Sequence, residues 1–556
     1  MSYLYQILGK NRSRIVLLSV IVSIYSLSGL VYALLFRNLA DQAIRGSFSD
    51  IRRDSLVFVC VLLLQNVLNA FIHRLQEKTS VDIENRLKKI ILSDIFLRDY
   101  TEVSNVHSGE WINKITNDIA IVARNAVQLL PNFCSIVVHI LASVIVLTGF
   151  LPKLMVLLLF VVCIALVFEF FFYRYIKLLH KRVQEEDGLL RIFLQEHIKS
   201  LVVIKSYSKE ESSIDDFERN LNKYKDARLK KNLFSVIMNF FFGTGINGAL
   251  IISSIYCAYE IINQRISYGT FVAVIQIVSQ IRGPIAGAYV NIPNFYSMIG
   301  SIERLAESEK YPEDKTDSVT DMNEFYKDSF GNIDLSGVSF EYRDENNRKQ
   351  VIEGLSFVIR KGAFIGISGP SGCGKSTLFK LLLSLYHPIS GNISIVTKGE
   401  RIELSNHFRK LFAYVPQDNM LMKGKIKDII CFGENYDENR MIDSLKISCC
   451  EEFIDKLPEG IDSELKEGGS GLSEGQMQRI AIARAVYSGH PILLLDEVTS
   501  ALNEELEIQI LKNLKEMTNR TVLLITHHKK ALDYADIVVD CSEEEDRYIW
   551  SIRKKK

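Results

Sequence analysis

The chain has 556 residues, and its 66 Lys and Arg residues balance its 66 Asp and Glu residues. This length exceeds one ordinary domain, and the positive mean hydropathy is unusual for a soluble enzyme. The balanced charge argues against a nucleic-acid partner, which would favour a basic domain. The cysteines show neither zinc-site spacing nor a disulfide framework, so they are expected to be small buried hydrophobic residues.

Long apolar segments dominate the first half of the chain. Several approach the roughly 20 residues that a helix needs to cross a bilayer. The six segments are Ile15–Phe36, Leu56–Ile72, Phe133–Phe150, Leu154–Tyr173, Leu233–Ile262 and Phe271–Tyr289. The first is too long for a cleavable signal peptide and lacks a small-residue cleavage site. The sequence therefore predicts an all-α polytopic membrane domain over residues 1–305.

The distribution of Lys and Arg predicts the orientation of these spans. The connections His73–Asn132 and Arg174–Asn232 are long and rich in positive charge, so they are expected in the cytoplasm. The connections around Lys153 and Arg265 are short and suit the outside, whereas the arginines of the Arg37–Ser55 loop run against the rule. Both long connections show helical spacing of apolar residues, so the spanning helices are expected to continue into the cytosol.

Three polar residues within the predicted spans are candidates for contact with a substrate. Arg282 lies near the middle of the sixth span, where a charge is costly and suggests a function. It could attract an anionic group of the substrate, or it could pair with Glu169 of the fourth span, and the sequence leaves both open. His139 lies in the middle of the third span and is a weaker candidate.

The character of the sequence changes after the last span. Residues 306–330 are charged and poor in aliphatic residues, which is typical of a linker. From residue 331 onward, short apolar runs such as Phe364–Ser368 and Val522–Ile525 alternate with helical patterns. This alternation predicts an α/β domain with a largely parallel sheet over residues 331–556.

The first of these apolar runs leads into a glycine-rich loop with the sequence GPSGCGKST. The strand–loop–helix context is that of a P-loop, whose backbone N–H groups surround nucleotide phosphates. Lys375 is expected to reach the outer phosphates, and the Ser376 hydroxyl is expected to bind Mg²⁺. The predicted nucleotide contacts in this loop are Gly369, Ser371, Gly372, Gly374, Lys375, Ser376 and Thr377.

A second strand pattern, PILLLDE, ends in two carboxylates with separate predicted roles. Asp496 is expected to hold the Mg²⁺ coordination shell, and Glu497 is expected to act as the general base for the attacking water. A carboxylate pair after an apolar strand is weak evidence by itself. The assignment therefore depends on the P-loop upstream.

The stretch SGLSEGQ precedes a helical pattern and forms a second candidate anion site. Ser473 suits a helix N-cap, Gly475 permits close backbone approach, and the positive end of the helix dipole favours a phosphate. Because the P-loop already surrounds its own nucleotide from one side, Ser473, Gly475 and Gln476 are predicted to face a nucleotide held by another chain. The alternative is an ordinary capped helix.

Taken together, these motifs resemble a known family. GPSGCGKST, LSEGQ, ILLLDE and ITHH follow the order and spacing of the nucleotide-binding domain of ATP-binding cassette (ABC) transporters, which contains a helical subdomain. Six spans followed by one cassette resemble an exporter-type half-transporter. The resemblance implies that Tyr342 stacks on adenine, that Gln417 links Mg²⁺ and water to the membrane domain, and that His527 senses the γ-phosphate. It also suggests that Ser108–Ile119 and Gln195–Glu211 carry helices that dock on the cassettes.

The resemblance also implies a function and its partners. These are ATP-driven export of an unidentified substrate across the cytoplasmic membrane, with Mg²⁺ as cofactor, the cassette on the cytoplasmic side, lipid around the spans and no nucleic acid. A second half-transporter, most simply a second copy, would complete two ATP sites, and a heterodimer stays possible. The six spans argue against soluble ABC ATPases that act on DNA or ribosomes. A lipid flippase, or a membrane regulator that does not pump, is the alternative.

One position departs from the family pattern. Family members usually have Asp where this chain has Asn503. The substitution keeps hydrogen bonding but removes a charge at the expected contact between cassettes. Communication between the two ATP sites is therefore expected to differ, while hydrolysis is expected to survive because Glu497 is present.

Overall fold

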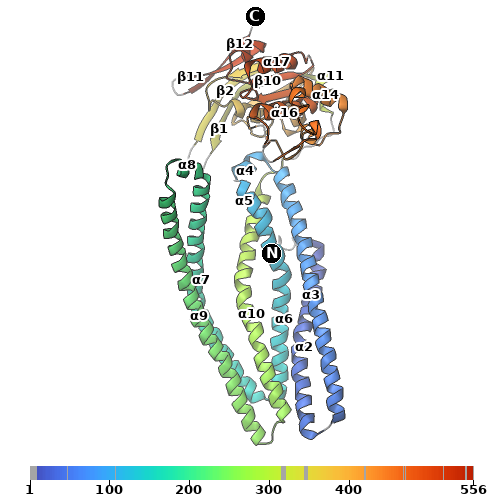
Figure 1. Ribbon diagram of the computed structural model, residues 1–556, viewed down its shortest axis with the longest axis vertical. Coiled ribbons are helices and arrows are strands. Elements are labelled where there is room, and N and C mark those ends of the chain that lie inside the picture. The colour runs from blue at the N-terminus through green and yellow to red at the C-terminus, as the bar shows by residue number, and fades with distance from the viewer. Residues whose placement is uncertain are drawn as a thin grey trace. The chain divides into compact units, whose positions relative to one another are not determined.

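The computed structural model describes residues 9–46, 48–106, 108–314, 321–343, 348–418, 421–466, 469, 471–517, 519–544 and 547–554. The chain divides into two compact units. One comprises Met1–Ser93 and Ser108–Glu309, and the other comprises Asp94–His107 and Lys310–Lys556. The described residues of the first unit form helices, and those of the second combine sheets with helices (Figure 1).

Long helices build the first unit, and each predicted apolar segment lies within one of them. They are α2 (Arg12–Arg45), α3 (Phe48–Leu97), α6 (Ile119–Phe150), α7 (Pro152–Lys199), α9 (Glu210–Ile262) and α10 (Tyr268–Glu307). The 50 residues of α3 span roughly 75 Å at the α-helical rise, more than twice the roughly 30 Å hydrocarbon core of a bilayer. Such helices extend well beyond a membrane, as the sequence predicts.

The apolar surface of these helices is largely uncovered within the chain. Among the described residues, four helical segments are long and apolar enough to cross a membrane, namely Arg12–Arg45, Phe48–Leu97, Ser108–Phe150 and Glu210–Ile262. The predicted fourth and sixth spans lie in α7 and α10, where many side chains fall outside the described residues. Only 6% of the apolar window of α3 is buried. Such a surface requires lipid or another protein chain to cover it.

Within the first unit, α2 packs against α6 and α10, and α7 runs beside α9 (Figure 1). A π-helical turn, Lys114–Asp118, follows the short helix α5 (Ser108–Asn113), and α8 (Leu201–Ser206) lies between α7 and α9. The buried Asp118 accepts a hydrogen bond from Arg304 of α10, with Nε and Oδ2 2.9 Å apart. This ion pair, in which only Asp118 is buried, joins the π-helical turn to the end of α10.

The second unit contains two main sheets. The four-stranded antiparallel sheet has the order β2 (Arg348–Arg360), β1 (Phe330–Arg343), β4 (Ser390–Thr397), β5 (Arg401–Glu403). The six-stranded sheet has the order β12 (Arg547–Lys554), β11 (Ile537–Glu544), β3 (Phe364–Ser368), β10 (Thr521–Ile525), β9 (Ile492–Asp496), β6 (Phe412–Val415). In this sheet β12 is antiparallel to β11 and the other neighbouring pairs are parallel, as the sequence predicts.

The central strands are apolar on both faces because both faces are covered. All residues of β9 are buried, as expected for a parallel strand between two layers. Leu494 packs in one core with Phe379 of α12 (Lys375–Leu382). Leu493 points to the opposite core, which includes Ile480 of α16 (Glu474–Tyr487). Alternate residues of one strand therefore join two hydrophobic cores.

Shorter elements complete the second unit, including the predicted helical subdomain. Its helices are α13 (Ile426–Cys431), α14 (Glu438–Ile447), α15 (Glu451–Ile454) and α16, beside the small sheet of β7 (Gly424–Lys425) and β8 (Glu464–Leu465). The remaining helices of this unit are α4 (Tyr100–Asn105), α11 (Met322–Asp328) and α17 (Glu504–Lys515). Short 3₁₀-helices lie at Gly9–Asn11, Ser308–Lys310, Asn406–Leu411, Gly460–Asp462 and Ala531–Tyr534.

A short segment from between α3 and α5 belongs to the second unit. The Thr101 hydroxyl of α4 donates to the Leu385 carbonyl at 3.2 Å, and the Tyr100 and Tyr386 rings lie 5.9 Å apart. The resemblance suggested a docking helix within Ser108–Ile119, but that stretch forms α5, the π-helical turn and the start of α6 in the first unit. Helix α4 therefore packs on the cassette within the second unit, and docking of Ser108–Ile119 and Gln195–Glu211 stays a prediction.

Candidate active site

The predicted catalytic residues follow four adjacent strands at one edge of the six-stranded sheet. The P-loop follows β3, His527 follows β10, Glu497 follows β9 and Gln417 follows β6. Because these neighbouring strands are parallel, their carboxyl ends meet at the same edge, where open α/β sheets bind ligands. The fold thus gathers residues that lie far apart in the sequence.

The P-loop has the backbone conformation that phosphate binding requires. Gly374, the N-cap of α12, has a φ of 97°, and a Cβ atom there would lie 2.7 Å from Val351 Cγ1. Only glycine fits such a position without strain. The buried Lys375 ammonium donates to the carbonyls of Gly369 and Pro370 at 2.9 and 3.0 Å. Its charge therefore lies at the loop that would enclose the phosphates.

Asp496 is the residue best suited to hold a metal in this site. Its side chain is buried, Oδ2 accepts from Tyr414 Oη at 3.3 Å, and the nearby Ser376 side chain favours the charged carboxylate. Burial raises the pKa of Asp496. The buried Oδ1 atom has no hydrogen-bond partner among the described residues, and an orphaned carboxylate oxygen beside a serine hydroxyl suits Mg²⁺. The residues therefore fit the predicted ion.

Glu497 lies between two other predicted catalytic residues. Its Oε2 accepts from Gln417 Nε2 at 2.9 Å, and its Oε1 lies 3.0 Å from His527 Nε2. The Glu497 backbone has a φ of 54°, and its N–H donates to the Ile525 carbonyl at 3.1 Å. A positive φ is costly for a residue with a side chain and is often found at functional sites. The turn after β9 therefore directs this carboxylate toward Gln417 and His527.

Tyr342 lies on β1 beside the start of α12. Its hydroxyl is 3.0 Å from the Thr377 hydroxyl, and its ring packs edge-on against Phe340 and Tyr386. The residue is 38% exposed, so part of the ring is accessible to a planar ligand. This position, next to the P-loop helix, is compatible with the predicted adenine contact.

The structure places Ser473, Gly475 and Gln476 at the N-terminus of α16, apart from the P-loop network. Ser473 and Gln476 form a reciprocal capping box: Ser473 N–H donates to Gln476 Oε1 at 2.8 Å, and Gln476 N–H donates to Ser473 Oγ at 3.3 Å. Gly475 has a second reason to be glycine, because a Cβ there would lie 3.0 Å from the Ala501 carbonyl. None of the hydrogen bonds described for Ser473 and Gln476 involves a P-loop residue.

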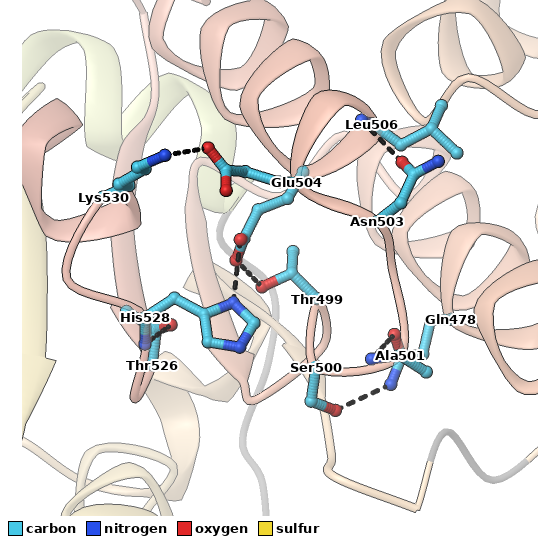
Figure 2. Close-up of polar contacts among 11 residues, drawn as sticks. Gln478, Thr499, Ser500, Ala501, Asn503, Glu504, Leu506, Thr526, His528 and Lys530 are labelled. Carbon is cyan, nitrogen blue, oxygen red and sulfur yellow. Dashed lines mark hydrogen bonds and ion pairs between the residues drawn. The ribbon is translucent and has the colours of Figure 1, made fainter.

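The segment that follows Glu497 contains contacts that sequence reasoning missed. Gln478 of α16 donates to the Ser500 hydroxyl at 3.1 Å and accepts from the Ala501 N–H at 3.2 Å (Figure 2). Asn503 caps α17 by accepting from the Leu506 N–H at 3.0 Å. The neutral Asn503 side chain therefore performs the capping that Asp would also perform. His528 Nδ1 lies 2.8 Å from Glu507 Oε2. The pair of adjacent histidines in ITHH was the only feature of the sequence that pointed to this contact.

Of the three predicted substrate residues, the structure describes the side chain of His139 but not those of the other two. His139 is buried, and its Nδ1 lies 3.1 Å from the Ser26 carbonyl of α2, so this side chain takes part in packing α6 against α2. The side chains of Arg282 and Glu169 lie outside the described residues. The choice between a substrate contact and an ion pair therefore stays a prediction.

Cys373 in the P-loop is predicted to react as a thiolate near neutral pH. A hydrogen bond from Cys541 lowers the pKa of Cys373, burial raises it, and the charge of Lys375 lowers it further. The result is a pKa of about 7 for Cys373. The thiolate fraction should therefore rise at lower pH than for an ordinary thiol, whose pKa is about 8.5. Cys373 is fully buried, so N-ethylmaleimide can react with it only when the loop opens, and we expect labelling through such openings to approach its plateau by about pH 8. ATP should slow labelling by closing the loop.

Mass spectrometry of the labelled peptide measures this reaction directly. A short cysteine-containing peptide in free solution supplies the reference thiol, whose labelling should continue to rise above about pH 8. Parallel pH profiles for Cys373 and the reference peptide would contradict the predicted thiolate.

Comparison with known proteins agrees with this arrangement. Residues 352–500 match the sequence model of the ABC transporter family, and residues 15–285 match that of the ABC transporter transmembrane region. A Rickettsia felis protein named for export ATP-binding/permease activity is 30% identical over 542 residues, which cover 94% of this chain and 91% of that protein. The ATP-dependent lipid A-core flippase of Desulfotalea psychrophila is 27% identical, over 87% of this chain and 84% of that protein.

A solved structure shows the same fold. The structure of a bacterial Atm1-family ABC exporter with ATP bound matches with a TM-score of 0.81 at 20% identity, covering 98% of this chain and 96% of that one. The expected helical membrane domain followed by an ABC ATPase domain is thereby confirmed, and the protein is an ATP-hydrolysing membrane translocase. The chain therefore belongs to the ABC transporter family as an exporter-type half-transporter.

Proposed function

We propose that two copies of this chain pair head to tail through their cassettes and export a substrate across the cytoplasmic membrane by alternating access. Each ATP lies between the P-loop of one copy and Ser473, Gly475 and Gln476 of the other, and a two-fold axis makes the two sites equal. The cassettes lie on the cytoplasmic side. ATP stabilises the closed dimer, and hydrolysis releases it, so that the population shifts between inward- and outward-facing forms.

The observation that carries this proposal is the position of Glu497 between Gln417 and His527. Glu497 acts as general base and takes the proton of the attacking water. His527 and Lys375 hold the outer phosphate oxygens, and Gln417 orients the water. The chemistry fits phosphoryl transfer, in which catalysis consists mostly of positioning and charge stabilisation.

Three residues would hold the metal ion in this mechanism. Asp496, Ser376 and Gln417 would bind Mg²⁺. When bound, Mg²⁺ neutralises charge that develops on the phosphate oxygens. Among the described residues no group of three His, Cys, Asp or Glu side chains could hold a metal alone. The nucleotide phosphates would therefore supply the remaining ligands.

A lipid is the second candidate substrate, since one relative is named as a lipid A-core flippase. An assay of purified protein in inside-out vesicles tests whether the substrate is a soluble compound or a lipid. Drugs and peptides would be added outside the vesicles, fluorescent phospholipids would be incorporated into the vesicle membrane, and ATP-dependent accumulation or leaflet transfer would be measured. Glu497→Gln vesicles serve as the matched control. ATP hydrolysis without movement of any compound or lipid would instead favour a regulator or gate.

A further inference from the structure

A buried carboxylate lies behind the catalytic residues and makes two hydrogen bonds. Glu507, in the first turns of α17, is 3% exposed. Its Oε1 accepts from the Thr499 hydroxyl at 2.7 Å, and its Oε2 lies 2.8 Å from His528 Nδ1. Figure 2 labels the two partners, Thr499 and His528. Burying a carboxylate costs free energy unless hydrogen bonds compensate. Both oxygens have a partner, so the cluster is a satisfied network.

The two partners of Glu507 belong to the two segments that carry catalytic side chains. Thr499 lies two residues after Glu497, in the turn that leaves β9, and His528 directly follows His527 after β10. Glu497 and His527 themselves are 3.0 Å apart. Glu507 therefore links two main-chain segments. The spacing of these segments sets the distance between Glu497, the proposed base, and His527, the proposed phosphate sensor.

Local backbone contacts make this link stiff. The His528 N–H donates to Thr526 Oγ1 at 3.0 Å, and the Leu502 N–H donates to the Thr499 carbonyl at 3.1 Å. On the far side of the same turn, Gln478 bonds to Ser500 and Ala501. The segment between Glu497 and α17 is thus held by α16 at one side and by Glu507 at the other.

We propose that Glu507 is a positioning residue for ATP hydrolysis, which holds Glu497 and His527 at their working separation through Thr499 and His528. Glu507 does not touch the nucleotide in this arrangement. Its loss changes the rate of the chemical step and leaves nucleotide binding at the P-loop intact. The inference rests on the proposed roles of Glu497 and His527.

The same helix turn provides a matched control. Glu504 of α17 is exposed and pairs with Lys530, so both glutamates join α17 to the segment that follows β10 (Figure 2). Exposed ion pairs contribute little because water screens them. Glu504→Gln removes the same charge from the same helix without touching the buried network.

Steady-state ATPase measurements on the full-length protein in nanodiscs test the proposal. Displacement of catalytic groups by about 1 Å can cost about 100-fold in rate, so we expect kcat to fall by about 10- to 100-fold in Glu507→Gln and Thr499→Val, with the KM for ATP within about twofold of wild type. Glu504→Gln should retain wild-type kcat. Direct binding of a fluorescent ATP analogue separates affinity from turnover.

Rescue by a conservative variant distinguishes positioning from simple packing. His528→Leu removes the donor to Glu507 and should lower kcat, whereas His528→Asn places an amide donor near the Nδ1 position and should restore most of it. If Glu507→Gln prevents folding, Thr499→Val and the two His528 variants carry the test alone.

The outcomes separate this proposal from the proposed function. Wild-type kcat in Thr499→Val and His528→Leu would overturn the positioning role, as would a KM that rises in parallel with the loss of kcat. The Glu497→Gln variant is measured alongside. If Glu497→Gln also turns over ATP normally, the assignment of the catalytic site fails. If Glu497→Gln is inactive while the Thr499 and His528 variants turn over ATP normally, only the role of Glu507 is rejected.

Discussion

Replacement of Glu497 by Gln is expected to lower ATP turnover by about 100- to 10,000-fold, because a positioned general base contributes a factor of this size. The amide keeps the shape of the side chain and can still contact Gln417 and His527, which lie 2.9 and 3.0 Å from the carboxylate oxygens. Binding of ATP should therefore persist. The variant should accumulate as an ATP-bound closed dimer.

Phosphate release measures turnover, and size-exclusion chromatography with radiolabelled ATP measures the retained nucleotide. Glu505→Gln supplies the control, since Glu505 is an exposed carboxylate of α17 outside the site. The control should behave as wild type in both assays. Turnover near the wild-type rate in Glu497→Gln would refute its assignment as the base.

The second large effect concerns the sharing of each ATP site between two chains. Lys375→Ala removes the phosphate-binding ammonium, and Ser473→Arg places a bulky cation at the N-terminus of α16, where the capping box lies. Each variant alone should be inactive as a homodimer. If one site uses the P-loop of one chain and the capped helix of the other, a mixed dimer of the two variants keeps one complete site. Mixing them should therefore restore nucleotide trapping.

The matched control carries both substitutions in one chain and pairs it with a wild-type chain. That mixed dimer has the same number of altered residues but no complete site, so it should trap no nucleotide. Vanadate-trapped ADP on affinity-tagged mixed dimers provides the measurement. Equal trapping in the two mixed dimers would contradict the shared site, as would full activity of a single copy in a nanodisc.

The sequence carries most of the information on the catalytic edge of the sheet. The P-loop and the two carboxylates that end PILLLDE could be assigned because each follows an apolar run and because parallel strands place their carboxyl ends together. The positions of Tyr342, Gln417 and His527 came from family order alone, since a single residue of these types has no distinctive spacing. The structure brings Gln417 and His527 to Glu497 and Tyr342 to Thr377.

Other features could not be predicted because they depend on tertiary contacts. In the sequence, Glu507 cannot be distinguished from an ordinary glutamate on a helix surface. Only the packing of α17 shows that it is buried against Thr499 and His528. Helix α4 has six residues, too few to show a hydrophobic period. The sequence predicts that Gly475 lets the backbone approach a phosphate closely. The structure adds a second reason for glycine, because a Cβ atom there would crowd the Ala501 carbonyl.

The length of α3 has a mechanical consequence. A rigid rod of roughly 75 Å that pivots by about 5° near one end displaces its other end by about 6 Å, which exceeds one helical turn. In the proposed alternating-access cycle, slight tilting of such rods at one end would become a displacement of several ångström at the other end. Small movements of intact helices would then suffice to open and close the proposed pathway.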